Sequence, residues 1–301
     1  MVPLGVWNGN ERPNVVLLKV YWIETLTGRG RNMKLGFSTL GCPEWGIEEI
    51  IDAARSNGYD GVELRHYEGS LDLVEAIGAF SGGAVEFRRR FERAGVEICC
   101  VDSSLRLADP HVAVSEGERM IELAMSLGTP YVRVFGGEVQ TGETREQALK
   151  RAAAVFSRLG KKAHQRGKRM LLETHDAFSL GKQVAELLDE VGGEGTGCLW
   201  DLHHPVRLGE KPSETARLIG NRTYHTHVKD SGDDGIYRRL GEGTVPLQEL
   251  VRELHGVGYK GYLCLEWEKA WHPDLAGPEI VFPHTARYLS ELLRKLGIPR
   301  G

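Results

Sequence analysis

The sequence predicts a single (β/α)8 barrel, and three observations support this fold class. Short apolar runs alternate with amphipathic stretches, and successive runs recur at intervals of about 26 to 39 residues. Alternation at this period requires parallel strands joined by right-handed crossovers, and eight such units close into a barrel. The chain of 301 residues is long enough for one such barrel. The alternative, an open doubly wound sheet, is disfavoured because the segment GFSTLGCPEWG after the first strand lacks GxGxxG spacing.

Eight strands are expected, each an apolar run bounded by Gly, Pro or Asp. In chain order the runs are KLGFS (34–38), GVELR (61–65), EICCVDS (97–103), YVRVFG (131–136), RMLLETH (169–175), GCLWDLH (197–203), TYHTHVK (223–229) and GYLCLEW (261–267). The active site of such a barrel lies at the carboxyl ends of its strands, where the βα loops meet. Residues at those ends are therefore the candidates for function.

Amphipathic helices are expected between the strands, for instance over residues 46–58, 115–128 and 144–167. In the first of these, one helix face is apolar and is formed by Ile47, Ile50, Ile51 and Ala54. Gly58 is expected to end this helix. Strand and helix alternate strictly, as the barrel requires.

Composition narrows the class of partner. With 38 basic and 42 acidic residues the formal net charge is -4, so no basic surface for nucleic acid is expected. The five cysteines are interpreted as reduced core residues of a cytoplasmic protein, neither a disulfide framework nor a thiolate metal site. They are Cys42, Cys99, Cys100, Cys198 and Cys264.

The chain is divided into an N-terminal extension of uncertain order, residues 1–32, and a barrel domain, residues 33–301. The apolar stretch VVLLKVYWI in the extension is interrupted by Lys19 and is too short to span a bilayer. The residues before it lack the basic flank of a signal peptide. We therefore expect no membrane association and a cytoplasmic location.

Four consecutive strands end on polar side chains: Glu173, Asp201, His227 and Glu266. They converge on one rim of the barrel, where unpaired carboxylates would repel one another and lose solvation. A bound cation resolves this conflict. Three carboxylates and one imidazole suit Mn²⁺ best, with Mg²⁺, Co²⁺ or Zn²⁺ as alternatives.

The segments LLETHD, LWDLHHP, HTHVKD followed by LGEGTVP, and LCLEWE resemble the signature segments of the xylose isomerase-like barrel superfamily, specifically its sugar phosphate isomerase/epimerase group. The resemblance extends from Met33 to the C-terminus. It implies that the four strand-end residues are the ligands of one divalent metal ion. It also implies an isomerase or epimerase of a sugar, sugar phosphate, inosose or keto acid, and pairing into homodimers or homotetramers.

The resemblance implies a mechanism as well. The ion chelates adjacent carbonyl and hydroxyl oxygens, a glutamate removes the proton between them, and an enediolate forms on the metal. Glu173 and Glu266 are expected to act both as ligands and as the proton-transferring pair. His204 is expected to polarise a substrate oxygen, or else to form a hydrogen bond with Asp201.

Four further residues are candidate substrate contacts for a small polyol or sugar. Glu63 would bind hydroxyls or tie the barrel together. Lys229 would contact a substrate oxygen or form an ion pair, and Arg133 would neutralise the carboxylates. Trp45 would wall the site. His225 is expected to be packed or to support the ligands.

The sequence departs from ketose 3-epimerases in two places, since Ser179 and Asp233 stand where those enzymes have a glutamate and an arginine. This favours inosose or keto-acid chemistry. A metal-dependent dehydratase of an inosose or 3-dehydroshikimate is the alternative, because it shares the enolate step. A nuclease resembling endonuclease IV is disfavoured, because the fourth strand end, VFGGE, has no histidine.

Overall fold

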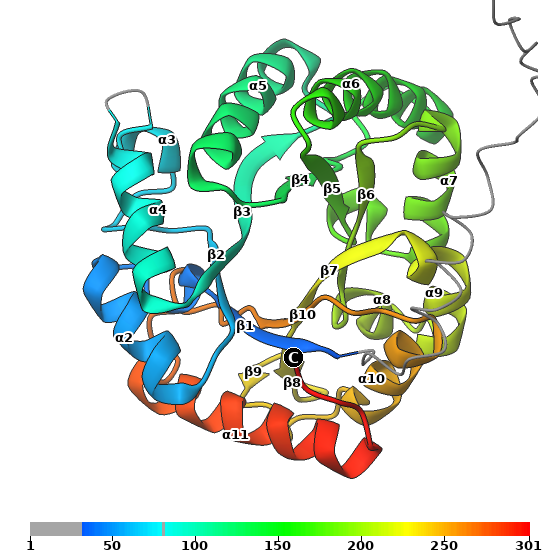
Figure 1. Cartoon of the computed structure of the whole chain (residues 1–301). Coiled ribbons are helices and arrows are strands. Elements are labelled where there is room, and N and C mark those ends of the chain that lie inside the picture. Colours follow the sequence, from blue (N-terminus) through cyan, green and yellow to red (C-terminus); the bar gives the residue numbers. More distant parts are fainter. Residues whose placement is uncertain (1–31, 80–81) are drawn as a thin grey trace, which may run out of the picture.

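Eight parallel strands close into a barrel in the computed structural model, which describes residues 32–79 and 82–301. The order around the barrel is β1-β10-β7-β6-β5-β4-β3-β2 (Figure 1). The strands are β1 (Lys34–Ser38), β2 (Gly61–Leu64), β3 (Glu97–Arg106), β4 (Tyr131–Phe135), β5 (Arg169–Glu173), β6 (Thr196–Asp201), β7 (Thr223–Val228) and β10 (Tyr262–Leu265). The fold class and all eight strands predicted from sequence are confirmed. The extension expected over residues 1–32 lies outside the described residues except for its last position.

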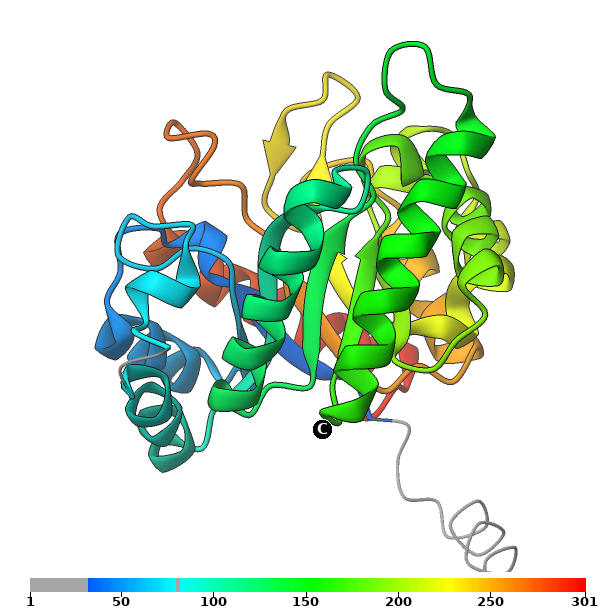
Figure 2. The ribbon, with the colours of Figure 1, turned by 90° about the horizontal axis from the view of Figure 1, so that it is seen from above.

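Helices cover the outside of the barrel (Figures 1 and 2). They are α2 (Ile47–Asn57), α3 (Leu73–Ala76), α4 (Gly83–Ala94), α5 (Pro110–Leu127), α6 (Arg145–Gln165), α7 (Gly181–Val191), α8 (His204–Arg207), α9 (Pro212–Ile219), α10 (Leu247–Gly256) and α11 (Pro278–Leu296). Single 3-10 turns are η1 (Thr39–Gly41), η2 (Asp176–Phe178) and η3 (Gly220–Arg222). No helix in the described part of the chain is long and apolar enough to cross a membrane.

Local signals explain where the predicted helices begin and end. The predicted apolar face of α2 is buried, and Gly58 ends the helix with φ 71°, a left-handed conformation that favours glycine. Helix α6 begins after Thr144, whose side chain accepts a hydrogen bond from the Gln147 backbone in a capping box. Helix α5 begins at Pro110, five residues before the predicted start at 115, because proline suits the first helical turn.

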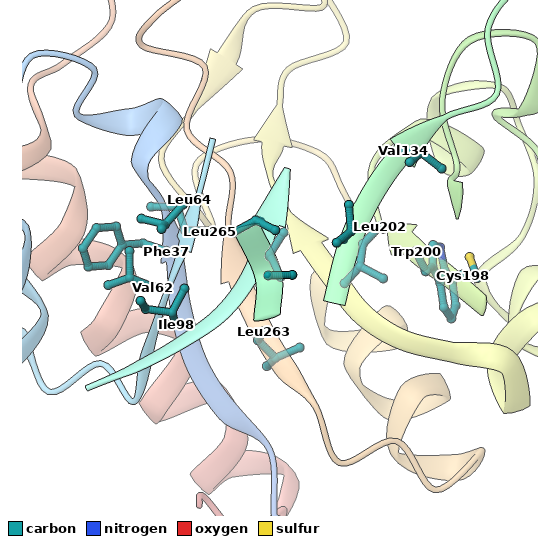
Figure 3. Packing of buried hydrophobic residues seen from close by; sticks show 14 of the residues in the cluster. Phe37, Val62, Leu64, Ile98, Val134, Cys198, Trp200, Leu202, Leu263 and Leu265 are labelled. Atoms are coloured by element: carbon teal, nitrogen blue, oxygen red, sulfur yellow. The ribbon is translucent and has the colours of Figure 1, made fainter. Parts of the chain in front are cut away.

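The main hydrophobic core lies between the strands and the helices. Phe37 of β1 packs against Phe282 of α11, with ring centroids 4.2 Å apart. Figure 3 shows part of this core, with Val62 and Leu64 of β2 beside Phe37. Because side chains alternate along a strand, Glu63, which lies between these two residues, faces the barrel interior. In β2, alternation thus places the apolar side chains outside the barrel and Glu63 inside.

The longest loops rise from one end of the barrel, the end where the strands finish (Figure 2). One of them carries an antiparallel hairpin, β8 (Asp230–Ser231) with β9 (Tyr237–Arg238). Asp230 holds the base of this loop, because its carboxylate accepts hydrogen bonds from the backbone of Gly241, Gly243 and Val245. These loops surround the strand ends that the sequence singled out.

Candidate metal centre

The four predicted ligands come together at the carboxyl ends of neighbouring strands. Glu173 ends β5, Asp201 ends β6, His227 lies in β7, and Glu266 follows β10. One ligating atom from each lies within 4.8 Å of the others, and all four side chains are buried. His227 Nδ1 is 3.1 Å from Glu173 Oε1 and 3.2 Å from Glu266 Oε2. The predicted convergence is therefore present, and the role of the four as ligands stays a prediction.

These donors fit a hard divalent cation. Glu173 Oε2 and Asp201 Oδ2 are buried and accept no hydrogen bond of good geometry, although Arg133 and Lys229 lie beside them as ion-pair partners. In the described residues, six buried carboxylates in this region face three buried Lys and Arg side chains and His227, whose pKa the nearby glutamates raise, and this leaves negative charge for an ion to balance. The carboxylates are Glu63, Asp102, Glu173, Asp201, Glu266 and Glu268, and the cations are Arg65, Arg133 and Lys229.

Lys229 forms a set of ion pairs inside the cluster. Its Nζ lies 2.9 Å from Asp201 Oδ2 and 2.8 Å from Glu268 Oε1, and it also pairs with Glu266. Burial disfavours the ammonium charge, but Asp201 and Glu266 outweigh it and raise the pKa of Lys229 well above its usual value. Of the two roles expected for Lys229, the structure shows the ion pair, and substrate contact stays a prediction.

Arg133 neutralises carboxylates, as the sequence suggested. Its Nη2 donates to Asp102 Oδ2 at 2.9 Å, and its Nε lies 3.2 Å from Glu173 Oε2. Burial disfavours the guanidinium charge, but Asp102 and Glu173 outweigh it and raise the pKa of Arg133. Only 1 % of the Arg133 side chain is exposed, so the structure shows its contacts with carboxylates, and substrate binding by Arg133 stays a prediction.

Glu63 ties the barrel interior together. Its Oε2 accepts hydrogen bonds from His225 Nε2 at 2.9 Å and from His227 Nε2 at 3.0 Å, and none of its side chain is exposed. Burial raises the pKa of Glu63. The charge of His227 and the hydrogen bonds that Glu63 accepts from both histidines outweigh burial, and they hold the pKa of Glu63 well below the usual range. The second bond turns His227 so that Nδ1 faces the carboxylates. Of its two expected roles, the structure shows the structural one.

His204 lies at the mouth of the site. Its Nδ1 donates to the carbonyl oxygen of Thr174 at 2.7 Å, which leaves Nε2 available to a substrate oxygen. The same Nδ1 is 3.8 Å from Asp201 Oδ2, while the His203 and His204 backbone N–H groups donate to Asp201 Oδ1. The geometry therefore accommodates both expectations for His204, as a support of Asp201 and as a substrate contact.

Glu268 and Asp102 belong to this cluster and were missed as site residues. Alternation could have identified Glu268, because it lies two residues beyond Glu266 on the same side of the chain. Asp102 ends an apolar run in the same way as the four predicted ligands do. Burial raises the pKa of Asp102 to about 7, although Arg133 opposes the shift.

A cavity of about 410 Å³ opens where the loops after β1, β2 and β10 meet. Trp45 and His66 line one part of it, and Lys269 and Ala270 line another. Trp45 also packs edge-on against Phe282, with ring centroids 5.7 Å apart. Trp45 was predicted to line the site, and it does line a cavity beside the strand ends. Its contact with substrate stays a prediction.

The two positions that depart from ketose 3-epimerases make local contacts. Ser179 Oγ donates to the Asp176 carbonyl oxygen at 2.8 Å. Asp233 Oδ1 accepts from Thr244 Oγ1 at 2.7 Å. The arginines of the same loop are paired as well, Arg238 with Asp234 and Arg239 with Glu242. These residues therefore stabilise the loops around the site.

Comparisons with known proteins agree with this fold. The fructoselysine 3-epimerase of Escherichia coli O157:H7 is 25% identical over 248 residues, which cover 78% of this chain and 90% of that protein. Among solved structures, the IolI protein with a bound zinc atom superposes with a TM-score of 0.74 at 18% identity, over 87% of this chain and 99% of the other. The probable 3-DHS dehydratase AsbF of Bacillus anthracis superposes with a TM-score of 0.72 at 19% identity, over 86% of this chain and 99% of the other. The family model for the xylose isomerase-like TIM barrel matches residues 51–292, and the chain belongs to this family.

Proposed function

We propose that the protein is a divalent-metal-dependent isomerase or epimerase of a sugar, sugar phosphate, inosose or keto acid. One observation carries this proposal: three carboxylates and an imidazole from four strand ends lie within 4.8 Å of one another in a buried, negatively charged cluster. The similarity to an epimerase supports the reaction class. Glu173, Asp201, His227 and Glu266 would hold the ion, for which we expect Mn²⁺ first and Mg²⁺, Co²⁺ or Zn²⁺ as alternatives.

The bound ion would supply Lewis acidity to a substrate carbonyl and its neighbouring hydroxyl. The residues supply the proton transfer. Glu173 and Glu266 come from β5 and β10, which β6 and β7 separate, so they approach a substrate carbon from different directions. One carboxylate takes the proton from the carbon next to the carbonyl, and the other returns a proton to the enediolate.

Both glutamates are ionised at neutral pH and can therefore accept a proton. Burial raises the pKa of Glu266, but the charges of His227 and Lys229 outweigh it and hold the pKa well below the usual range. Burial likewise opposes ionisation of Glu173, and the charges of Arg133 and His227 lower its pKa. With His227 neutral as a ligand of the ion, Arg133 and Lys229 would continue to stabilise the carboxylates during turnover.

The remaining residues would orient the substrate. His204 would donate to or accept from a substrate oxygen through Nε2, since Nδ1 is bonded to the Thr174 carbonyl. Trp45 would contact the part of the substrate that extends into the 410 Å³ cavity. The partner in this proposal is a small polyol or sugar, and the formal net charge of -4 gives no reason to expect nucleic acid.

A dehydratase is the second candidate, and one observation favours it. Expulsion of a hydroxyl group requires a general acid, and His175 lies at the rim with its Nδ1 2.6 Å from Asp176 Oδ1. Burial lowers the pKa of His175, but Asp176 and Glu173 outweigh it and raise the pKa. The rings of His175 and His204 are 4.8 Å apart, which places this acid beside the expected substrate contact.

Proton exchange in D₂O tests the proposal. The Mn²⁺-loaded protein is incubated with a panel of ketoses, inososes and keto acids, and NMR follows loss of the substrate C–H signal. We expect deuterium incorporation with an isomeric product. Glu173→Gln and Glu266→Gln should each abolish exchange, whereas Glu97→Gln, which changes an exposed carboxylate at the opposite end of β3, should retain it.

Three outcomes separate the candidates. Exchange accompanied by net loss of water would assign the dehydratase instead. Exchange that persists in both glutamine variants would refute the assigned bases. Wild-type protein that binds no divalent metal in elemental analysis would overturn the whole mechanism.

A further inference from the structure

A second group of side chains that could bind a metal ion lies inside the barrel, apart from the four predicted ligands. Cys99 of β3, His225 of β7 and Cys264 of β10 each place one ligating atom within 4.8 Å of the others. At most 2 % of any of these residues is exposed. Cys99 and Cys264 belong to a small cluster with Tyr262 that is separate from the main core.

The orientation of His225 points to a ligand. Its Nε2 is bonded to Glu63 Oε2 at 2.9 Å, while its Nδ1 is buried with no hydrogen-bond partner. His227 has the same arrangement, with Nε2 on Glu63 and Nδ1 facing Glu173 and Glu266. A carboxylate on one ring nitrogen is the usual way to orient a histidine whose other nitrogen binds a metal. Glu63 therefore supports two histidines that each present Nδ1.

The donor set selects a different metal from the one expected at the rim. Two thiolates and an imidazole are soft donors that favour zinc-like ions over Mg²⁺ or Mn²⁺. Two thiolates also balance the charge of a divalent ion, so the ion and its three ligands would add no net charge beside the buried carboxylate of Glu63. A monovalent copper ion would leave an uncompensated negative charge there.

We propose that Cys99, His225 and Cys264 bind one thiophilic divalent ion of the zinc class, at a site distinct from the carboxylate centre. Binding forms two metal–sulfur bonds and one metal–nitrogen bond, and the two thiol protons pass to water. The ion would link β3, β7 and β10 across the barrel interior and stabilise it. All five cysteines are free and buried, as the sequence predicted, and the proposal adds a metal-binding role for Cys99 and Cys264. The proposal does not depend on the proposed function.

Cadmium is the probe, because cadmium–thiolate bonds add a charge-transfer band in the ultraviolet, at shorter wavelength than the main Trp and Tyr bands, and carboxylate ligands do not. Since the site is buried, the full-length protein is refolded with Cd²⁺ and then freed of excess ion. We expect the absorption band in wild-type protein, in Glu173→Gln, and in the control Cys198→Ser, whose buried thiol lies outside the cluster. Cys99→Ser/Cys264→Ser should lose it. Absence of the band in wild-type protein, or its survival in the double variant, would overturn the proposal.

A measurement on wild-type protein alone covers the case in which the double variant fails to fold. Protein refolded with and without Zn²⁺ is treated with an alkylating reagent in mild denaturant, and peptides are compared by mass spectrometry. We expect Zn²⁺ to slow alkylation of Cys99 and Cys264 at least several-fold relative to Cys198. Equal protection of all three would indicate general stabilisation by the carboxylate centre and refute a thiolate site.

Discussion

Lys229→Met should destabilise the metal-free protein far more than an ordinary surface change. The substitution keeps the apolar stem and removes the ammonium group that pairs with Asp201, Glu266 and Glu268. Only 3 % of Lys229 is exposed, so the three carboxylates would lose a buried counter-charge. Removing one partner of a buried ion pair typically costs about 3–5 kcal/mol. We therefore expect a loss of that size in the free energy of unfolding.

A divalent ion should recover part of this loss. The ion and the ammonium group balance the same carboxylates, so Mn²⁺ should bind more tightly and stabilise the variant more than the wild type. At one hundred times its Kd a ligand adds about 2.7 kcal/mol of stability, which sets the scale of the wild-type gain.

Urea denaturation in chelator and in Mn²⁺ measures both effects. Lys34→Met is the matched control, because Lys34 forms an exposed pair with Glu97 and should cost about 0–1 kcal/mol. A loss below about 1 kcal/mol for Lys229→Met, or an equal loss with and without Mn²⁺, would show that Lys229 does not share its carboxylates with the ion.

Three further predictions follow from the same contacts. Glu63→Gln should weaken Mn²⁺ binding about 10–100-fold in calorimetry, because His227 loses its orienting carboxylate, and unchanged affinity would refute that role. His203 has a pKa lowered to about 4, chiefly by burial, so the folded state binds fewer protons than the unfolded state between about pH 6.5 and 4. The free energy of unfolding should therefore fall by up to about 3 kcal/mol as the pH drops through this window. His203→Gln should remove most of this pH dependence when the urea midpoint is measured against pH. An unaltered dependence would show that another group causes it. Trp45→Ala should raise KM with little change in kcat. Trp271 is 48% exposed, and the control Trp271→Ala should change neither constant. A change in kcat alone for Trp45→Ala would show that Trp45 does not bind substrate.

The convergence of the four strand-end donors could be predicted because it depends on local features. Glu173 and Asp201 each end an apolar run, and parallel strands in a barrel bring such ends to one rim. Strand positions and helix faces follow from the same periodicities. The start of α5 was missed, because Pro110 begins the helix before the periodic segment does.

The counter-charges around the ligands could not be predicted in this way. Lys229 lies on the same strand end as His227, but its choice of Asp201 and Glu268 depends on the shape of the packed loops. Sequence left an ion pair and a substrate contact equally open for it. Glu63 was undecided for the same reason, since its partners on β7 lie more than 160 positions away.

The sequence by itself determined the barrel, its active end and the four candidate ligands, because side-chain alternation and strand direction are properties of each segment alone. Only the tertiary structure decided which interior groups face one another. Closure of eight strands brought Glu63 of β2 to both histidines of β7, and Cys99 of β3 to Cys264 of β10. Such contacts depend on the register and tilt of strands across the barrel, which no local pattern specifies.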